Sequence, residues 1–170
     1  MDARFLAAVA TALLLSACAG NAPQTSARNT EAVPATPRSA SAPSAPGNQA
    51  ARVALRMVGA PYLYGGANPK DGFDCSGLVY YSYTTNGYSV PRTAQALFKA
   101  AQKIPLEDAN EGDLVFFQDQ AKLSHVGIYL GDGMFVHAPS SGDAVSIASL
   151  ATSYYQRHLV AVGRLSPSRL

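Results

Sequence analysis

The sequence predicts an α+β fold in which helices come first and an antiparallel sheet follows. Apolar residues recur at helical spacing in the region that starts at residue 50. Later in the chain the pattern changes to short apolar runs, of which Leu114–Phe117 is the first. Gly131-Asp132-Gly133 separates two such runs and has the composition of a tight hairpin turn. Helices followed by consecutive strands are typical of the α+β class.

The N-terminal segment has the features of an export signal. Arg4 precedes an apolar run from Phe5 to Leu15 that is too short to span a bilayer as a stable anchor. The run ends in Leu15-Ser16-Ala17-Cys18, which resembles the lipobox of bacterial lipoproteins. We therefore expect residues 1–17 to be a lipoprotein signal peptide and Cys18 to carry lipid (palmitate). The alternative is an ordinary signal peptide cleaved near Ala17 or Ala19.

Lipid on Cys18 implies membrane attachment in the cell envelope. Ala19 follows this cysteine, and in enterobacteria-like sorting a residue other than aspartate there indicates the outer membrane, with the protein facing the periplasm. Residues 18–49 are rich in Ala, Pro, Ser and Thr and contain no aromatic residue, so they cannot bury enough surface to offset the entropy of ordering. We predict that they form a disordered tether.

Residues 50–170 have the length of one domain. The chain has a formal net charge of +2 and no basic run, which argues against nucleic-acid binding. Gly59-Ala60-Pro61 ends the first predicted helix, and Thr93 is a candidate cap of the third. The expected helices are Ala50–Val58, Cys75 to a stop at Asn86-Gly87, and Ala94–Lys103, and the expected strands are Leu114–Phe117, Ser124–Leu130, Met134–Ala138, Ala144–Ile147 and Leu159–Leu165.

Cys75 occupies the first turn of a predicted buried helix. Asp74 before it can accept the free amide hydrogens of that turn. A thiol at a helix N-terminus meets the positive end of the helix dipole, which favours the thiolate. The sequence therefore predicts a reactive cysteine with a lowered pKa, against the simpler reading of a small buried apolar residue.

The cysteine count supports a reactive role. The chain has two cysteines, an even number that permits one disulfide in an exported protein. If Cys18 carries lipid, Cys75 has no partner. An unpaired thiol in an oxidising compartment is typical of a functional site.

Three histidines complete the set of candidate catalytic groups. His125 and His137 fall on the two strands of the predicted hairpin, so their rings can face each other across neighbouring strands. We expect the Cys75 helix to pack on the sheet face that carries them. A thiol, an imidazole and a group that orients the imidazole are the parts of a cysteine protease. His158 reads as a surface residue before the last strand.

Motifs along the whole domain resemble those of the NlpC-type (NlpC/p-sixty) bacterial cell-wall cysteine peptidases, a family with a trimmed papain-like core. The order and spacing of the motifs carry the resemblance, because a lone Asp-Cys-Ser-Gly would be weak. The matching runs are Tyr62–Gly66, Asp74–Gly77, Pro91–Thr93, Gly112–Phe117, Ser124–Tyr129 and His137–Ala138.

The resemblance implies a role for each matching residue. Cys75 would be the nucleophile, His125 the base and His137 the orienting residue. Tyr62 matches a tyrosine of the oxyanion site, with Tyr64 as the alternative. The positions near the substrate groove are Asp74, Ser76 and Arg92. The implied reaction is hydrolysis of peptide stems or crosslinks in peptidoglycan, without metal or cofactor, and the residues name no adaptor lipoprotein as a partner.

Three alternatives stay open at this point. Cys75, His125 and His137 could bind zinc, since thiolate and imidazole are good zinc ligands. The domain could be a catalytically silent cell-wall binding module. The same fold could also serve as an amidase or acyltransferase. The bond cut, D-glutamyl-diaminopimelate or diaminopimelate-D-alanine, depends on groove shape and is not predicted.

Overall fold

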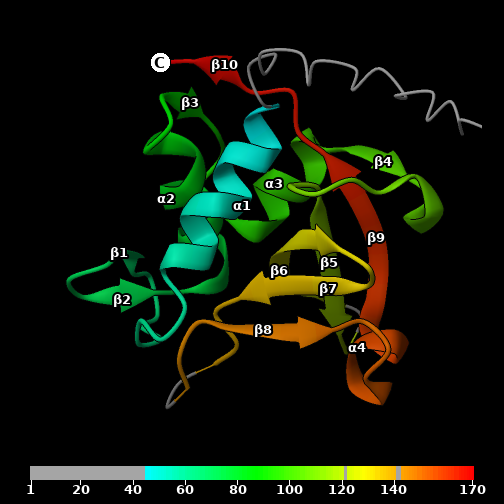
Figure 1. Cartoon of the computed structure of the whole chain (residues 1–170). Helices are drawn as coiled ribbons and strands as arrows, with labels where there is room; N and C mark the ends of the chain where they lie inside the picture. The colour runs from blue at the N-terminus through cyan, green and yellow to red at the C-terminus, as the bar shows by residue number, and fades with distance from the viewer. Residues whose placement is uncertain (1–44, 121, 141–142) are drawn as a thin grey trace, which may run out of the picture. The chain divides into compact units, whose positions relative to one another are not determined.

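Three helices from the first half of the domain pack on one face of a six-stranded antiparallel sheet (Figure 1). The computed structural model describes residues 45–120, 122–140 and 143–170. The predicted signal peptide, Cys18 and residues 18–44 of the predicted tether lie outside these ranges. In the part that is described, no helix is long and apolar enough to cross a membrane.

The helices follow the predicted order, with one addition near the C-terminus. Their bounds are α1 Pro46–Arg56, α2 Cys75–Thr84, α3 Ala94–Ala100 and α4 Ser153–His158, and a 3-10 turn covers Leu106–Asp108. The predicted caps of α2 and α3 are confirmed. Asp74 accepts from the Gly77 amide, and Thr93 accepts from the Ala96 amide.

The large sheet has the strand order β4-β9-β5-β6-β7-β8, and every pairing is antiparallel. Its strands are β4 Gln102–Ile104, β5 Leu114–Asp119, β6 Lys122–Gly131, β7 Met134–His137, β8 Ser146–Ser149 and β9 Leu159–Arg164. Two short antiparallel pairs lie outside it: β1 Ala67–Asn68 with β2 Gly72–Phe73, and β3 Tyr88–Ser89 with β10 Ser168–Arg169.

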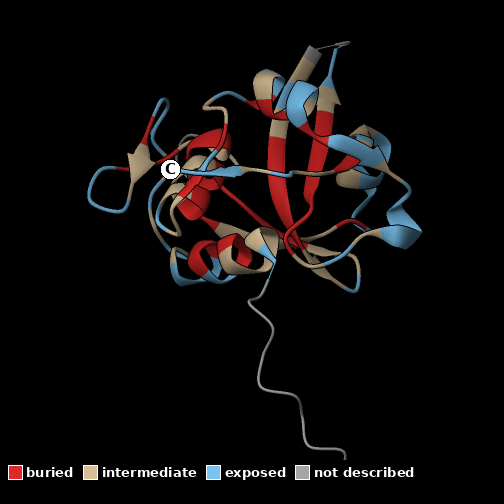
Figure 2. Cartoon of the chain, turned by 90° about the horizontal axis from the view of Figure 1, so that it is seen from above, coloured by how far each residue is buried: buried red, intermediate tan, exposed pale blue. Residues whose placement is uncertain are grey.

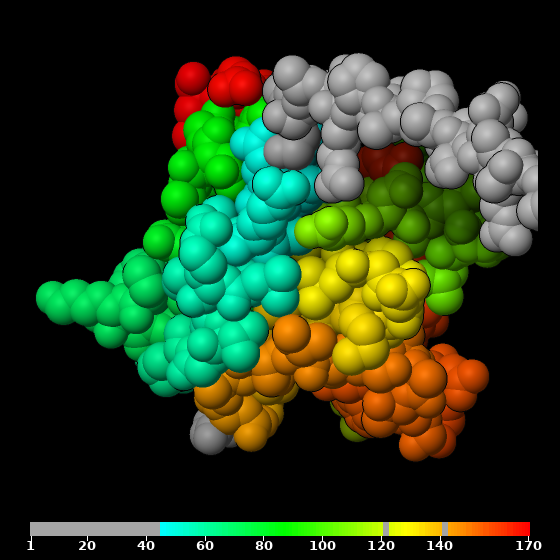
Figure 3. Space-filling view, in the orientation of Figure 1, coloured from blue at the N-terminus to red at the C-terminus, as the bar shows by residue number. Residues whose placement is uncertain are grey.

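The predicted hairpin turn between β6 and β7 is confirmed. Gly131, Asp132 and Gly133 have φ values of +96°, +51° and +72°, which glycine adopts readily and aspartate tolerates. A second turn joins β1 to β2, where the Asn68 side chain accepts from the amides of Lys70 and Asp71. That turn projects from the surface beside α1 (Figure 3).

Strand β5 runs through the centre of the domain and is buried on both faces. Leu114 and Phe116 belong to the main core under the helices, and Val115 and Phe117 belong to a smaller core on the opposite face. Figure 2 shows the central strands as the buried part of the sheet. Because both faces are covered, β5 is apolar at consecutive positions instead of alternating.

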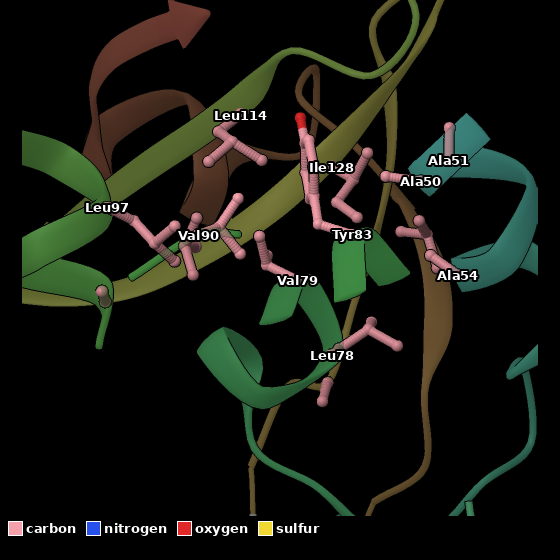
Figure 4. Close-up of a cluster of buried hydrophobic side chains, with 14 of the residues drawn as sticks. Ala50, Ala51, Ala54, Leu78, Val79, Tyr83, Val90, Leu97, Leu114 and Ile128 are labelled. Atoms are coloured by element: carbon pink, nitrogen blue, oxygen red, sulfur yellow. The ribbon is translucent and has the colours of Figure 1, made fainter. Parts of the chain in front are cut away.

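The main core joins α1, α2 and α3 to the sheet. Leu78, Val79 and Tyr83 of α2 are at most 1% exposed. Figure 4 shows them close to the alanines of α1 and to Ile128 of β6. The Tyr83 hydroxyl donates to the Gly112 carbonyl at 3.2 Å, which satisfies the polar end of this buried side chain.

Helix α1 begins earlier than the sequence predicts, so the expected boundary of the tether at residue 49 is four residues too late. Pro46 occupies the first helical turn, where its missing N–H costs no hydrogen bond. Gly47 then passes so close to Gly112 that a Cβ on Gly112 would lie 2.0 Å from the Gly47 carbonyl carbon. This contact ties residues with tether-like composition to the domain.

Further elements differ from the prediction, among them β8, which covers Ser146–Ser149 instead of the expected Ala144–Ile147. Helix α3 ends at Ala100, because Gln102–Ile104 pairs with β9 at the edge of the sheet. Helix α4 was not predicted, because its six residues carry no apolar stripe; the sequence indicated only that His158 is a surface residue, and none of the six is buried.

Candidate active site

Cys75 is the first residue of α2, and its thiol is free and half-buried. The Asp74 carboxylate caps the helix by accepting from the Gly77 amide at 2.6 Å. The sulfur itself is approached by three backbone N–H groups, from Val126, Ser76 and Cys75. The amide of Val126 belongs to β6, so the nucleophile sits where the helix start meets this strand.

The pKa of the Cys75 thiol is nevertheless raised above its ordinary value. Burial is the largest cause, the Asp74 carboxylate acts in the same direction, and the three backbone amides oppose them. The prediction of a lowered pKa at Cys75 is therefore wrong for the structure without substrate. The helix start supplies N–H donors, but it also places a carboxylate next to a sulfur that is shielded from water.

His125 and His137 lie together, as the sequence predicts. Nε2 of His125 is 2.8 Å from Nδ1 of His137, and the two rings meet edge to face with centroids 5.0 Å apart. His137 is 2% exposed. The contact occupies one nitrogen of His125 and leaves Nδ1 for a proton from the nucleophile.

Burial lowers the pKa of both imidazoles, to about 3 for His125 and about 4 for His137. The neighbouring His137 also lowers the pKa of His125, whereas the Asp143 carboxylate acts in the opposite direction on His137. Both rings are therefore neutral at neutral pH. With the pKa of the Cys75 thiol raised as well, the unliganded site has no preformed thiolate–imidazolium pair.

The histidines do not lie on the sheet face that α2 covers, which corrects the arrangement expected from the sequence. The ring of His125 contacts Phe117, and that of His137 contacts Phe135, on the side of the smaller core. Helix α2 packs on the opposite face, with Val126 and its neighbours. The Cys75 sulfur reaches β6 at the amide of Val126, one residue after His125, instead of facing both rings across one sheet face.

A β-bulge lies at this point. Phe117 of β5 pairs with His125, but the next residue, Gln118, pairs with Leu123, so Ser124 is left as the extra residue. Bulges bend a strand and re-aim its side chains. The bulge thus sets the direction of His125 relative to the rest of β6, a feature that residue spacing alone does not reveal.

Two adjoining depressions flank this part of the strand. One, of about 500 Å³, is lined by Cys75 and Tyr62, and the other, of about 240 Å³, is lined by His125; Ser124 borders both. A larger depression of about 590 Å³ lies at the start of α1 and contains none of the predicted site residues. Within the described residues no hydrogen bond joins the Cys75 sulfur to His125.

The three residues predicted near the substrate groove form one hydrogen-bonded cluster beside Cys75. Arg92 donates to both oxygens of Asp74 and to the Ser76 hydroxyl, each at 3.1 Å. It also donates to the carbonyls of Gly65 and Gly66, at 2.9 and 3.1 Å. All three side chains line the depression that holds the nucleophile.

Asp74 stays ionised in this cluster. Burial by itself raises the pKa of its carboxyl, but the hydrogen bonds from Arg92 and Gly77 and the charge of Arg92 bring the pKa below the ordinary value. The charges of Asp74 and Arg92 thus neutralise each other within the cluster. The cluster holds the start of α2 in position and also lines the depression that contains Cys75.

Tyr62 and Tyr64 line the same depression but differ in their surroundings. Tyr62 is half-buried against the core, and its pKa is raised by burial and then by the nearby Cys75 and Asp74. Tyr64 is 88% exposed. Electrostatic contact with Cys75 favours Tyr62 as the tyrosine of the oxyanion site.

One polar neighbour of the site has no counterpart in the sequence analysis. The hydroxyl of Tyr155, on α4, lies 3.3 Å from Nε2 of His137. The run Tyr154-Tyr155 before the last strand was the available signal, but its helix carries no periodic pattern. Tyr155 thus extends the hydrogen-bonded row of side chains His125–His137 by one residue.

The structure also bears on the zinc alternative. No three His, Cys, Asp or Glu side chains among residues 45–120, 122–140 and 143–170 come together in a way that could hold a metal ion. His125 and His137 direct one nitrogen at each other, in a hydrogen bond. His158, the third histidine, lies away from them and bonds to the Tyr154 carbonyl at 2.7 Å.

Comparison with known proteins agrees with this architecture. The chain is 41% identical over 116 residues to the murein DD-endopeptidase MepH of Escherichia coli (65% of this chain, 43% of the relative). It is 44% identical over 115 residues to the bifunctional muramidase/DL-endopeptidase CwlT of Bacillus subtilis (66% and 34%). The matches thus span less than half the length of these relatives.

A solved structure and a family model complete the comparison. A lipoprotein-like NLP/P60 family protein from Staphylococcus aureus superposes with a TM-score of 0.64 at 39% identity, covering 71% of this chain and 41% of that one. The family model described as NlpC/P60 matches residues 59–164, which include Cys75, His125 and His137. This chain belongs to the NlpC/P60 family.

Proposed function

We propose that this chain is a peptidoglycan endopeptidase that hydrolyses amide bonds of stem peptides or crosslinks through Cys75. The observation that carries the proposal is the placement of a free thiol at a helix start against the amide of Val126, the residue that follows His125, together with the hydrogen-bonded pair His125–His137. Relatives named as murein and DL-endopeptidases support the substrate class.

The reaction begins with both partners neutral. When a peptide fills the depression beside Cys75, the thiol transfers its proton to Nδ1 of His125 as the sulfur bonds to the scissile carbonyl carbon. His137 accepts a hydrogen bond from Nε2–H of His125 and stabilises the imidazolium that forms. In unliganded enzymes such catalytic contacts are often long and tighten with substrate.

The oxyanion of the tetrahedral intermediate needs donors close to Cys75. We assign this role to the backbone amide of Cys75, which acts on its own sulfur, and to the hydroxyl of Tyr62, whose side chain lines the same depression. One such donor is typically worth about 3 kcal/mol in the transition state. His125 then gives its proton to the leaving amine, and water releases the acyl group from the sulfur.

Digestion of defined muropeptides tests this function. Wild-type protein should release cleaved stem peptides, and Cys75→Ala should release none while keeping the same thermal unfolding midpoint. Mass spectrometry of the products identifies the bond, D-glutamyl-diaminopimelate or diaminopimelate-D-alanine. Products of acyl transfer or of amide cleavage outside the peptide would contradict an endopeptidase, and binding without products would indicate a silent module.

We also propose that Cys18 carries lipid and that the domain acts at the outer membrane, facing the periplasm. The lipobox-like Leu15–Cys18 supports lipidation, and Ala19 supports the outer membrane. Labelled palmitate should appear in the wild-type protein and be absent from Cys18→Ser. Fractionation of membranes then tests the location, and wild-type protein found in the soluble fraction would contradict it.

A further inference from the structure

Tyr155 extends the row of hydrogen-bonded groups that starts at His125. Its hydroxyl lies 3.3 Å from Nε2 of His137, whose Nδ1 lies 2.8 Å from Nε2 of His125. Its ring packs against the rings of Phe117 and Phe135, whose centroids lie 5.2 and 4.9 Å from that of Tyr155. The hydroxyl is therefore fixed at the far end of the pair by aromatic packing.

The position of the proton on His137 decides whether His125 can act. To accept the Cys75 proton, His125 needs a lone pair on Nδ1 and its own hydrogen on Nε2. That Nε2–H donates to Nδ1 of His137, so His137 must carry its hydrogen on Nε2. This second hydrogen then points at the Tyr155 hydroxyl, which can accept it.

In the other tautomer of His137, His125 cannot accept a proton from Cys75. A hydrogen on Nδ1 of His137 would be donated to Nε2 of His125 and would leave the hydrogen of His125 on Nδ1, the nitrogen that must be free. We propose that Tyr155 is a positioning residue, which holds His137 in the tautomer that lets His125 accept the proton of Cys75. The inference rests on the proposed function in assigning that proton transfer.

The Tyr155 hydroxyl affects the tautomer of His137 because the His137 ring is buried. His137 is 2% exposed, so an Nε2–H without an acceptor would be buried and unsatisfied, which protein interiors strongly avoid. Without the hydroxyl, the proton is better placed on Nδ1, facing His125. The other group that acts on His137 is the Asp143 carboxylate, which accepts from the Ser140 hydroxyl at 2.9 Å.

The tautomers can be read in the full wild-type chain by nitrogen-15 NMR of labelled histidine. The chain has three histidines, so His158→Gln and His137→Asn suffice to assign the signals. Near neutral pH we expect both His125 and His137 to be protonated on Nε2. A wild-type spectrum with His137 protonated on Nδ1 would overturn the inference without any variant at Tyr155.

Substitution gives the kinetic test, with a matched control on the same helix. Tyr155→Phe keeps the ring and removes the hydroxyl; loss of one hydrogen bond predicts a kcat about three- to tenfold lower at unchanged KM. Its spectrum should shift toward Nδ1 protonation. Tyr154→Phe should change neither quantity, because Tyr154 stacks on His158 and is 50% exposed.

A double-variant cycle separates positioning from general stability. In a His137→Ala background, Tyr155→Phe should lower kcat no further, because the hydroxyl acts through His137. Equal kcat and equal tautomers in wild type and Tyr155→Phe, or an additive loss in the double variant, would overturn the inference. If wild-type protein cleaves no muropeptide, the proposed function fails, whereas the NMR spectra still decide the role of Tyr155.

Discussion

Arg92 donates hydrogen bonds to both carboxylate oxygens of Asp74: Nη1 lies 3.1 Å from Oδ1, and Nη2 lies 3.1 Å from Oδ2. The same Nη2 reaches the carbonyls of Gly65 and Gly66. One guanidinium thereby joins the Tyr62–Gly66 turn, the cap of α2 at Asp74 and Ser76, the residue after Cys75. Side-chain exposures of 33% for Arg92 and 15% for Asp74 show that the pair is only partly open to water.

Arg92→Lys should destabilise the domain, although it keeps the charge. A lysine presents one ammonium and cannot reproduce the fork that meets both oxygens and the two carbonyls. We expect a loss of about 1–2 kcal/mol in the free energy of unfolding, measured with urea. Arg52→Lys on the exposed side of α1 is the control and should change the stability little. Equal free energies of unfolding for wild type and Arg92→Lys would refute the idea that the hydrogen bonds of Arg92 stabilise the start of α2.

Gly77→Ala should be more damaging than a methyl group in a helix normally is. A Cβ on Gly77 would lie 1.9 Å from the Gly66 carbonyl oxygen, so the Tyr62–Gly66 turn and the start of α2 would have to move apart. Overpacking of this kind typically costs about 1–3 kcal/mol, and activity should fall with it because Arg92 and Asp74 meet at this point. Thermal unfolding and muropeptide digestion measure the two effects.

Ser82→Ala on the same helix is the matched control for Gly77→Ala. Among the described residues, the Ser82 Oγ is a buried side-chain oxygen without a hydrogen-bond partner. Removing it should leave stability unchanged or raise it by up to about 1 kcal/mol. If Ser82→Ala were also destabilised, α2 would be sensitive to substitution in general. The loss of stability in Gly77→Ala could then not be assigned to the contact with Gly66.

Stability should fall as the pH drops from about 6.5 toward 4. The pKa values of His125 and His137 are lowered to about 3 and about 4 in the fold, so the unfolded chain takes up protons in this window and the folded one does not. Each group contributes a slope of about 1.4 kcal/mol per pH unit. The stability is fully present above the unfolded pKa and is lost on acidification.

Urea unfolding at several pH values measures that slope. His137→Asn should flatten it by removing one of the two groups, whereas His158→Gln should not, because His158 lies outside the buried pair. The lowered pKa of Asp74 adds loss of the same sign only at more acidic pH, below the ordinary range of a carboxyl. Stability that stays level between pH 7 and 5 would contradict neutral buried imidazoles.

Cys75 should react slowly with iodoacetamide at neutral pH and faster as the pH rises past that of an ordinary thiol. Burial raises the pKa of this thiol, and alkylation requires the thiolate. The rate is best followed in Cys18→Ser, where Cys75 is the remaining cysteine of the two in the chain. A rate that is already at its plateau below pH 7 would instead reveal a thiolate stabilised by His125.

Local signals in the sequence predicted much of the fold. Asp74 and Thr93 are caps because the side chain of each reaches the amide three residues further along the chain. Gly131-Asp132-Gly133 turns where positive φ is needed. The start of α1 and the end of α3 were misplaced because long-range contacts decide them: Gly47 meets Gly112, and Gln102–Ile104 pairs with β9.

By itself, the sequence determined the order of elements, the residue types of the site and the pairing of His125 with His137, because spacing along strands and helix turns is a local property. Only the tertiary structure decided which sheet face carries the histidines, that burial keeps the Cys75 thiol and both imidazoles neutral, and that Tyr155 joins the row. Those features depend on a bulge, on desolvation and on packing between distant segments, and all three arise only once the chain has folded.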